Sequence, residues 1–229
     1  MIRYEKGSAP AELTKLTATP GIDWEGLGKA DRDPIRTALV RDQGGLCAYC
    51  QRRITADDDP TTGHSQMKIE HWIPRASSKD HHLTWSNLLG VCLGVSRESA
   101  EGPPDRMTHH CDTSRGNHKL FLHPVQGQGP DPREHLRYTK GGEVKAAAEN
   151  ARVEDDIRAL NLNAWRLRRG REVILEELWK QLERSDFATN ELRRLARVYR
   201  IVTGTTVPEH AEFVRYHLLK KLRSRGETE

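Results

Sequence analysis

Apolar side chains recur at helical spacing through the last third of the chain, from about Val153 onward. Residues three or four positions apart share one face of a helix, so this pattern predicts amphipathic helices that bury a common face. The first stretch runs to Leu182, the second from Phe187 to Gly204, and the third begins at Pro208. We therefore expect an all-helical C-terminal region.

Before this region the pattern changes to short elements. A helix is expected from Asp33, because Pro34 suits a first helical turn and apolar residues follow at helical spacing until Gly44. Residues 67–74 alternate polar and apolar side chains, which predicts a short strand that its final proline ends. Both elements flank the chemically richest part of the sequence.

Loops and one hairpin complete the first two thirds of the chain. Residues 94–108 and 124–134 are rich in Gly, Pro and polar side chains, which is typical of loops. Residues 135–145 predict a hairpin that turns at Gly141 and Gly142.

These elements predict an α+β protein in three parts. Residues 1–30 are rich in Pro, Gly and Thr and are expected to form an extended N-terminal arm with Trp24 as its one strong anchor. Residues 31–150 form a mixed domain, and residues 151–229 form the α-helical C-terminal region.

Composition narrows the class of protein. Of the 229 residues 35% are apolar and 31% are charged, so the core is modest and much of the surface ionic. The chain has no apolar run of membrane-spanning length and no apolar leader, so we expect a cytoplasmic protein without membrane spans. A net charge of +4 permits binding to polyanions without requiring it.

The cysteines indicate a metal site. The chain has four of them, Cys47, Cys50, Cys92 and Cys111. In a reducing compartment such a set favours metal ligation over disulfides, and four thiolates can hold structural Zn²⁺ in a tetrahedron. Two alternatives stay open: Cys92 is simply a buried apolar residue, or His109 or His110 replaces one thiolate.

Polar residues suited to hydrolysis lie between and after the cysteines. They are Glu70, His71, Asn87, Asp112 and His118. Phosphodiester hydrolysis needs a base that activates water, and His71 can be that base. It also needs a hard cation, which Glu70 and Asp112 could hold as Mg²⁺ or Mn²⁺, with Asn87 or His118 as further ligands.

The order of these motifs resembles the HNH (ββα-metal) endonuclease core: Cys-x-x-Cys, Glu-His-x-x-Pro, Asn-Leu-Leu, Cys, then Cys-Asp-x-x-x-Gly-Asn. Gly45-Leu-Cys-Ala-Tyr-Cys50, His110-Cys-Asp112, Gly116-Asn117 and Leu160-Asn-Leu-Asn163 are similar to the PtuB-type HNH nucleases of retron and Septu anti-phage systems. This similarity covers most of residues 30–180. It implies a small zinc-stabilised ββα-metal core, so that residues 31–150 would be an HNH nuclease domain with a zinc knuckle.

The resemblance also implies a role for each site residue. His71 corresponds to the general base, and Asn87 to the middle asparagine that holds the active-site loop or binds metal. Common HNH enzymes carry His or Asn at the third position, where this chain has Asp112. Asp112 is therefore the first candidate ligand, with Glu70, for catalytic Mg²⁺ or Mn²⁺, and His118 is the reserve.

The function implied by the resemblance is metal-dependent hydrolysis of DNA by the nuclease effector of a bacterial anti-phage system. Its partner would be an ATPase of the ABC/SMC-like, PtuA type. Two alternatives are an RNA endonuclease, with tRNA among its substrates, and a non-catalytic zinc module that binds nucleic acid or a partner. Glu70, His71 and Asn87 argue against the last, because a binding module needs no carboxylate-histidine pair beside an amide.

Interaction surfaces are expected outside the core. Basic residues of the C-terminal helices could line a phosphate track or simply form a solvated helix face, since Glu residues interleave with them. The apolar stripes of these helices and the Trp24 arm are candidate surfaces for docking a partner.

Overall fold

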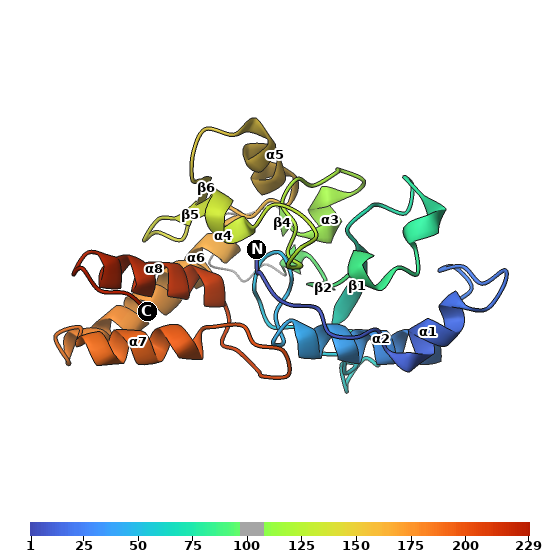
Figure 1. Ribbon diagram of the computed structural model, residues 1–229, viewed down its shortest axis with the longest axis horizontal. Helices are drawn as coiled ribbons and strands as arrows, with labels where there is room; N and C mark the ends of the chain where they lie inside the picture. The colour runs from blue at the N-terminus through green and yellow to red at the C-terminus, as the bar shows by residue number, and fades with distance from the viewer. Residues whose placement is uncertain (97–107) are drawn as a thin grey trace.

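The computed structural model describes residues 1–96 and 108–229 (Figure 1). Its helices are α1 (Ala11–Thr17), α2 (Lys29–Asp42), α3 (Asp112–Arg115), α4 (Pro132–His135), α5 (Ala151–Ala159), α6 (Trp165–Glu183), α7 (Thr189–Val198) and α8 (Ala211–Arg223). Its strands are β1 (Met67–His71), β2 (Leu88–Cys92), β3 (Val95–Ser96), β4 (Thr108–His109), β5 (Leu136–Tyr138) and β6 (Val144–Ala146). Helices and small antiparallel sheets together confirm the α+β class.

The strands form three separate two-stranded antiparallel sheets, β1–β2, β3–β4 and β5–β6. In the first sheet, His71 pairs with Leu88 and Met67 pairs with Cys92. The end of β1 therefore lies beside the start of β2, and a long connection joins these two points. The expected strand forms as β1 and ends at His71, and the expected hairpin forms as β5–β6. The loop expected at 94–108 falls mostly on residues 97–107, outside the described residues.

Helix α2 confirms the expected helix but begins earlier, at Lys29. The Asp31 carboxylate accepts the Gly28 N–H at 2.8 Å and caps the helix start, which the proline signal did not reveal. Pro34 consequently lies inside the helix. At its end the left-handed turn of Gly44 and Gly45, with φ of 64° and 73°, directs the chain into the first cysteine pair.

The first 30 residues do not form an extended arm. Ile2 donates its N–H to the Ala48 carbonyl at 3.0 Å, and α1 forms where no helix was expected. Apolar side chains of this segment, Leu13 and Trp24 among them, are buried in the core. Burial of these apolar side chains offsets the weak local helix signal.

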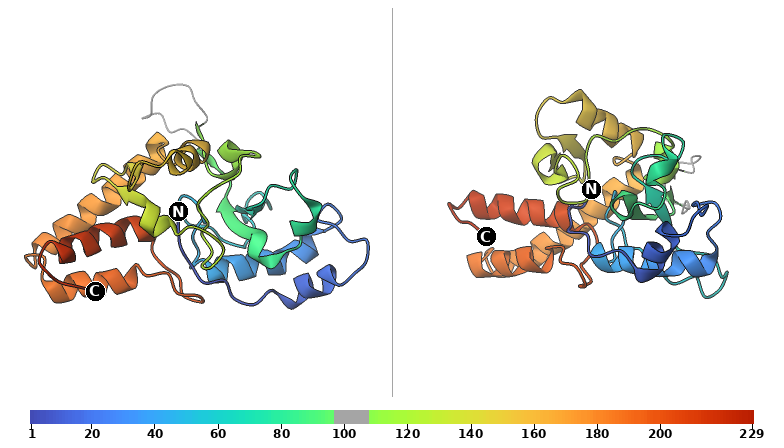
Figure 2. Two further views of the ribbon diagram at one scale, coloured as in Figure 1. Left: turned by 45° about the horizontal axis from the view of Figure 1, so that its top comes forward. Right: turned by 45° about the vertical axis from the view of Figure 1, so that its right-hand side comes forward.

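The three expected helical stretches of the C-terminal region form four helices, because the first stretch is divided into α5 and α6 and the other two form α7 and α8. Asn150 caps α5 by accepting the N–H groups of Arg152 and Val153. Helices α6, α7 and α8 lie together at one end of the molecule and α1 and α2 at the other, in both views of Figure 2. The apolar core is continuous across residue 150, so the division between residues 31–150 and 151–229 remains a proposal.

A buried arginine of α6 donates a hydrogen bond to the β5–β6 hairpin. Arg171 is 2% exposed and donates to the Gly142 carbonyl at 2.6 Å and the Leu162 carbonyl at 2.7 Å. These bonds satisfy carbonyls that water cannot reach.

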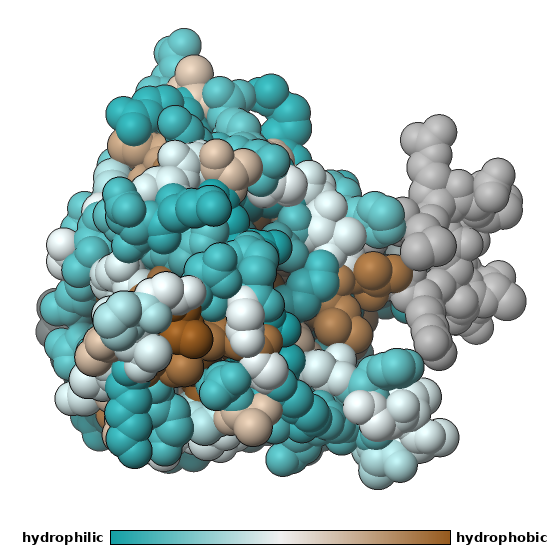
Figure 3. All heavy atoms as spheres, turned by 90° about the vertical axis from the view of Figure 1, so that its right-hand side faces the viewer, coloured by the Kyte–Doolittle hydropathy of each residue, from teal (hydrophilic) through white to brown (hydrophobic). Residues whose placement is uncertain are grey.

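The face at the α1–α2 end is largely hydrophilic, with small apolar areas (Figure 3). Within residues 1–96 and 108–229, no helix combines the length and the apolar character needed to cross a membrane.

Candidate active site

The four cysteines meet in the interior of the protein. Cys47 and Cys50 follow the glycine turn after α2, Cys92 ends β2, and Cys111 directly precedes α3. Their Sγ atoms all lie within 4.8 Å of one another, and none forms a disulfide. The alternative in which Cys92 is only a buried apolar residue therefore does not fit the structure.

The spacing of the sulfur atoms suits a tetrahedral metal. The Sγ atoms of Cys50 and Cys92 are 3.6 Å apart, and Cys111 Sγ lies 3.8 Å from Cys47 Sγ and 3.8 Å from Cys92 Sγ. A tetrahedron with Zn–S bonds of about 2.3 Å has edges of about 3.8 Å. The four cysteines could thus hold a metal such as zinc.

Histidine is not needed to complete this set of four ligands. His110 is fully buried, with Nδ1 at 3.2 Å from Cys111 Sγ. A ring N–H at that position can donate to the thiolate, which is how groups around a metal centre commonly support a ligand.

His71 ends β1 and is 4% exposed. Its Nε2 lies 2.9 Å from the His82 carbonyl oxygen, and its ring meets the Trp24 ring edge-on with centroids 4.5 Å apart. Since a carbonyl oxygen only accepts, Nε2 carries the hydrogen, and Nδ1 of the neutral ring has a lone pair. Burial lowers the pKa of His71 to about 4, so the ring is neutral near pH 7.

Trp24 therefore packs inside this protein and is not left free for a partner. It is 6% exposed, and its indole packs against His71 while the Arg32 guanidinium lies 5.3 Å from the ring centre. A partner could not use this side chain as a docking surface without opening the core.

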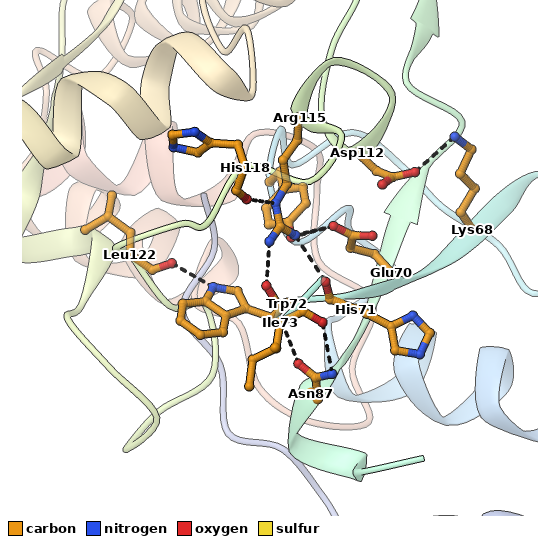
Figure 4. A network of polar contacts seen from close by, with 11 residues as sticks. Lys68, Glu70, His71, Trp72, Ile73, Asn87, Asp112, Arg115, His118 and Leu122 are labelled. Atoms are coloured by element: carbon orange, nitrogen blue, oxygen red, sulfur yellow. Dashed lines mark hydrogen bonds and ion pairs between the residues drawn. The ribbon is translucent and has the colours of Figure 1, made fainter. Parts of the chain in front are cut away.

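Asn87 fixes the connection that follows β1. Its Oδ1 accepts the Ile73 N–H at 2.6 Å, and its Nδ2 donates to the His81 carbonyl at 2.9 Å and the Ile73 carbonyl at 3.4 Å. The side chain is 4% exposed. All polar atoms of this amide are engaged by backbone groups, an arrangement that suits a loop-holding role better than metal ligation (Figure 4).

Glu70, which precedes His71 on β1, and Asp112 bring two carboxylates together. Burial, the largest cause, raises the pKa of Glu70 to about 8; the charge of Asp112 also raises it, and Arg115 opposes the shift. Tyr49 donates its hydroxyl to Glu70 Oε1 at 3.3 Å. Carboxylate oxygens are the ligands that Mg²⁺ and Mn²⁺ prefer, so the donor chemistry fits such a cation.

Each carboxylate has a cationic neighbour. Arg115, whose side chain is fully buried, pairs with Glu70 and donates to the backbone carbonyls of His71 and Trp72. Lys68 Nζ lies 3.0 Å from Asp112 Oδ2 and 2.8 Å from Thr113 Oγ1. Figure 4 shows the two cationic side chains, Arg115 and Lys68, on either side of the two carboxylates.

His118 lies apart from this pair. Its backbone carbonyl accepts Arg115 Nε at 2.8 Å, while its ring is directed away from Glu70 (Figure 4). The ring belongs instead to a pocket that Trp72 and Phe121 also line. Among the described residues, the cysteines are the one group of three or more His, Cys, Asp or Glu side chains close enough to hold an ion.

Three residues of the site were not predicted from the sequence. Arg115 was part of the motif Cys-Asp-x-x-x-Gly-Asn but appeared only as an unspecified position. No sequence motif indicated the other two residues. They are His82, whose carbonyl lies within hydrogen-bond distance of the His71 ring, and Lys68, which pairs with Asp112. The alternating pattern of β1 does place Lys68 and Glu70 on one face of the strand, which could have suggested a shared partner.

Comparison with known proteins gives two relatives, whereas no protein-family model matches the chain. The "Retron Vc95 putative HNH endonuclease" of Vibrio cholerae is 24% identical over 210 residues, which is 84% of this chain and 91% of the relative. The "Retron Ec83 putative HNH endonuclease" of Escherichia coli is 29% identical over 170 residues, 62% of this chain and 64% of the relative. These matches confirm the resemblance drawn from the motifs: the chain is homologous to two retron proteins that carry this description.

Proposed function

We propose that the protein is a metal-dependent HNH endonuclease that hydrolyses phosphodiester bonds in DNA. Its β1–β2 hairpin and α3 carry the three HNH positions: His71 ends β1, Asn87 precedes β2, and Asp112 begins α3. Homology to retron HNH endonucleases supports a nuclease.

The observation that carries the proposal is the orientation of His71. Its Nε2–H is directed to the His82 carbonyl, and its neighbour in sequence, Glu70, shares a site with Asp112. A neutral imidazole with a lone pair on Nδ1 can take a proton from water, which makes the water a nucleophile. The buried bond to His82 holds this tautomer during the reaction.

Glu70 and Asp112 are the residues that would hold Mg²⁺ or Mn²⁺. When bound, such a cation supplies positive charge that stabilises the phosphate and the leaving oxygen. In this structure Lys68, with a side chain 38% exposed, balances Asp112, and a cation would compete with it for the carboxylate. Asn87 has the separate task of fixing the loop that contains Ile73 and His81.

Zinc is the proposed occupant of the four-cysteine site. Its sulfur ligands come from the turn after α2, from the end of β2 and from the residue before α3. The metal would therefore join β2 to α3, the helix that carries Asp112. A structural role follows, since a site with four protein ligands leaves no position for substrate.

An ABC/SMC-like ATPase is the proposed partner, and anti-phage defence the proposed setting, as the resemblance to PtuB-type nucleases implies. With Trp24 buried, the remaining candidates for docking include exposed apolar residues of the C-terminal region, such as Trp165, Val198 and Val202. Co-expression followed by gel filtration tests whether the two proteins form a complex.

The substrate is tested by incubating the full chain, alone and with the ATPase, with supercoiled plasmid and with total RNA in Mg²⁺ or Mn²⁺. The proposal expects metal-dependent nicking of the plasmid. Cleavage of RNA with intact plasmid would replace DNA by RNA as the substrate, and binding without cleavage of either would favour a zinc module.

A further inference from the structure

A second site lies at the other end of the molecule from the candidate active site. It is a pocket of about 520 Å³ between the β5–β6 hairpin and helices α6 and α8. In Figure 1, α8 and β5 lie on the opposite side of the N-terminus from β1. The volume is within the usual range for small-molecule sites, about 300–1,000 Å³.

The wall of the pocket is strongly cationic. Five basic residues line it: Arg137, Lys140, Lys145, Lys220 and Lys221. Of these, Lys145 has an ion pair with Glu143 at 3.1 Å, and Lys221 lies over the Phe187 ring at 4.7 Å. The lining residues that the structure describes include neither Asp nor Glu, so the pocket attracts anions.

Aromatic rings make the rest of the wall. Trp179 of α6, Tyr138 of β5 and Tyr216 of α8 all line the pocket. The rings of Tyr138 and Tyr216 pack edge-on with centroids 5.4 Å apart, so both are held in place by the fold. A planar ligand group can stack on such a surface.

His217 provides an unused polar group at the same place. The residue is 5% exposed and lines the pocket, and its ring packs against Tyr216 and Trp179. Its Nε2 is buried and makes no hydrogen bond within the part of the chain that the structure describes. A buried nitrogen left without a partner costs stability, so a ligand that supplied one would be favoured.

We propose that this pocket binds one nucleotide unit, with phosphate on the lysines and the base against the aromatic wall. Cations alone would suit any anion, but the three aromatic rings and the unpaired His217 nitrogen suit a planar, hydrogen-bonding base attached to the phosphate. The unit is either a free nucleotide or part of a single strand. The site is separate from the HNH chemistry, because its residues belong to β5, β6, α6 and α8.

The test measures binding of three probes to the full chain without added Mg²⁺ or Mn²⁺: ADP, pyrophosphate and a short oligothymidylate. We expect ADP or the oligonucleotide to bind, and either one to bind more tightly than pyrophosphate. Binding of ADP alone identifies a free nucleotide and binding of the oligonucleotide alone a strand, and both results support the site. Pyrophosphate binding as tightly as both other probes, or no binding of any probe, overturns the proposal.

Charge reversal locates the site. Lys140→Glu with Lys220→Glu should weaken binding by roughly tenfold or more. The matched control, Lys15→Glu with Lys180→Glu, changes two exposed lysines outside the pocket and the same net charge, and it should change binding less than about twofold. Equal losses in both variants would refute the pocket. His71→Ala should keep the binding even where cleavage is lost, which separates this site from the nuclease site.

Discussion

The Nε2 atom of His71 lies 2.9 Å from the carbonyl oxygen of His82, eleven residues further along the chain. This bond fixes both the tautomer and the direction of the ring, because the carbonyl can only accept. It requires the connection between β1 and β2 to fold back over the end of β1. The geometry of the proposed base therefore depends on that loop.

Acid should destabilise the protein between pH 6.5 and pH 4. Burial lowers the pKa of His71, His123 and His217 to about 4, whereas an unfolded histidine titrates near 6.5. The unfolded chain binds protons first, so stability present above pH 6.5 is lost as the pH falls towards 4. For His71 the loss is on the order of 2 kcal/mol at pH 5.

Denaturant unfolding of wild type and His71→Gln at pH 7 and pH 5 checks this expectation, with metal content measured at each pH. His71→Gln should lose less stability than wild type between the two values. His64→Gln, which changes an exposed histidine, should behave as wild type. An identical pH response in all three proteins would show that His71 is not protected from protonation by the fold.

Asn87→Ala should release the loop after β1 and reduce cleavage without removing any group that reacts. The substitution leaves the Ile73 N–H and the His81 carbonyl without their side-chain partner. A cost of about 1–3 kcal/mol is expected for such buried groups. Hydrogen exchange should show faster exchange of the Ile73 amide, and unchanged exchange there would argue against a loop-holding role.

Arg115→Met should destabilise the protein by about 1–3 kcal/mol near pH 7, because it removes the cation beside buried Glu70 and leaves the carbonyls of His71 and Trp72 without their donor. Adding Glu70→Gln should restore part of this loss, as measured by urea unfolding. A surface pair supplies the control: Arg194→Met, which removes the exposed ion pair between Arg194 and Glu191, should leave the free energy of unfolding almost unchanged. Additive losses for Arg115→Met and Glu70→Gln would show that the two side chains are not coupled.

Removal of the proposed zinc should unfold the centre of the molecule. The purified chain should contain about one zinc, and Cys47→Ser should lower both the zinc content and the melting temperature, because a structural metal contributes folding free energy directly. Inductively coupled plasma analysis and thermal melts measure the two quantities. Complete loss of zinc with an unchanged melt would mean that the site is not structural.

The fold was predictable where the pattern is local. The alternation of residues 67–74 and the helical spacing after Val153 depend on near neighbours in sequence, and both predicted elements formed, although the strand ends at His71. The N-terminal segment was predicted wrongly as an extended arm, because α1 and Trp24 are fixed by contacts with distant parts of the core. Local propensity does not contain those contacts.

The candidate site was likewise predictable only in part. The motif order placed Cys47, Cys50, Cys92 and Cys111 in one metal site, and the structure brings them together. The bond from His71 to His82 and the pair of Glu70 with Arg115 join residues 11 and 45 positions apart. Neither follows a periodic pattern, so both needed the three-dimensional structure.

The central claim is tested most directly by the initial rate of plasmid nicking in Mg²⁺ and in Mn²⁺, with the ATPase present. His71→Ala should lower the rate by about a hundredfold or more, because it removes the proposed base while the fold persists. Asp112→Ala should lower it as well, with partial recovery at higher metal concentration, whereas His118→Ala should remain within about threefold of wild type. A fully active His71→Ala, or an active Asp112→Ala beside an inactive His118→Ala, would contradict this assignment of the site.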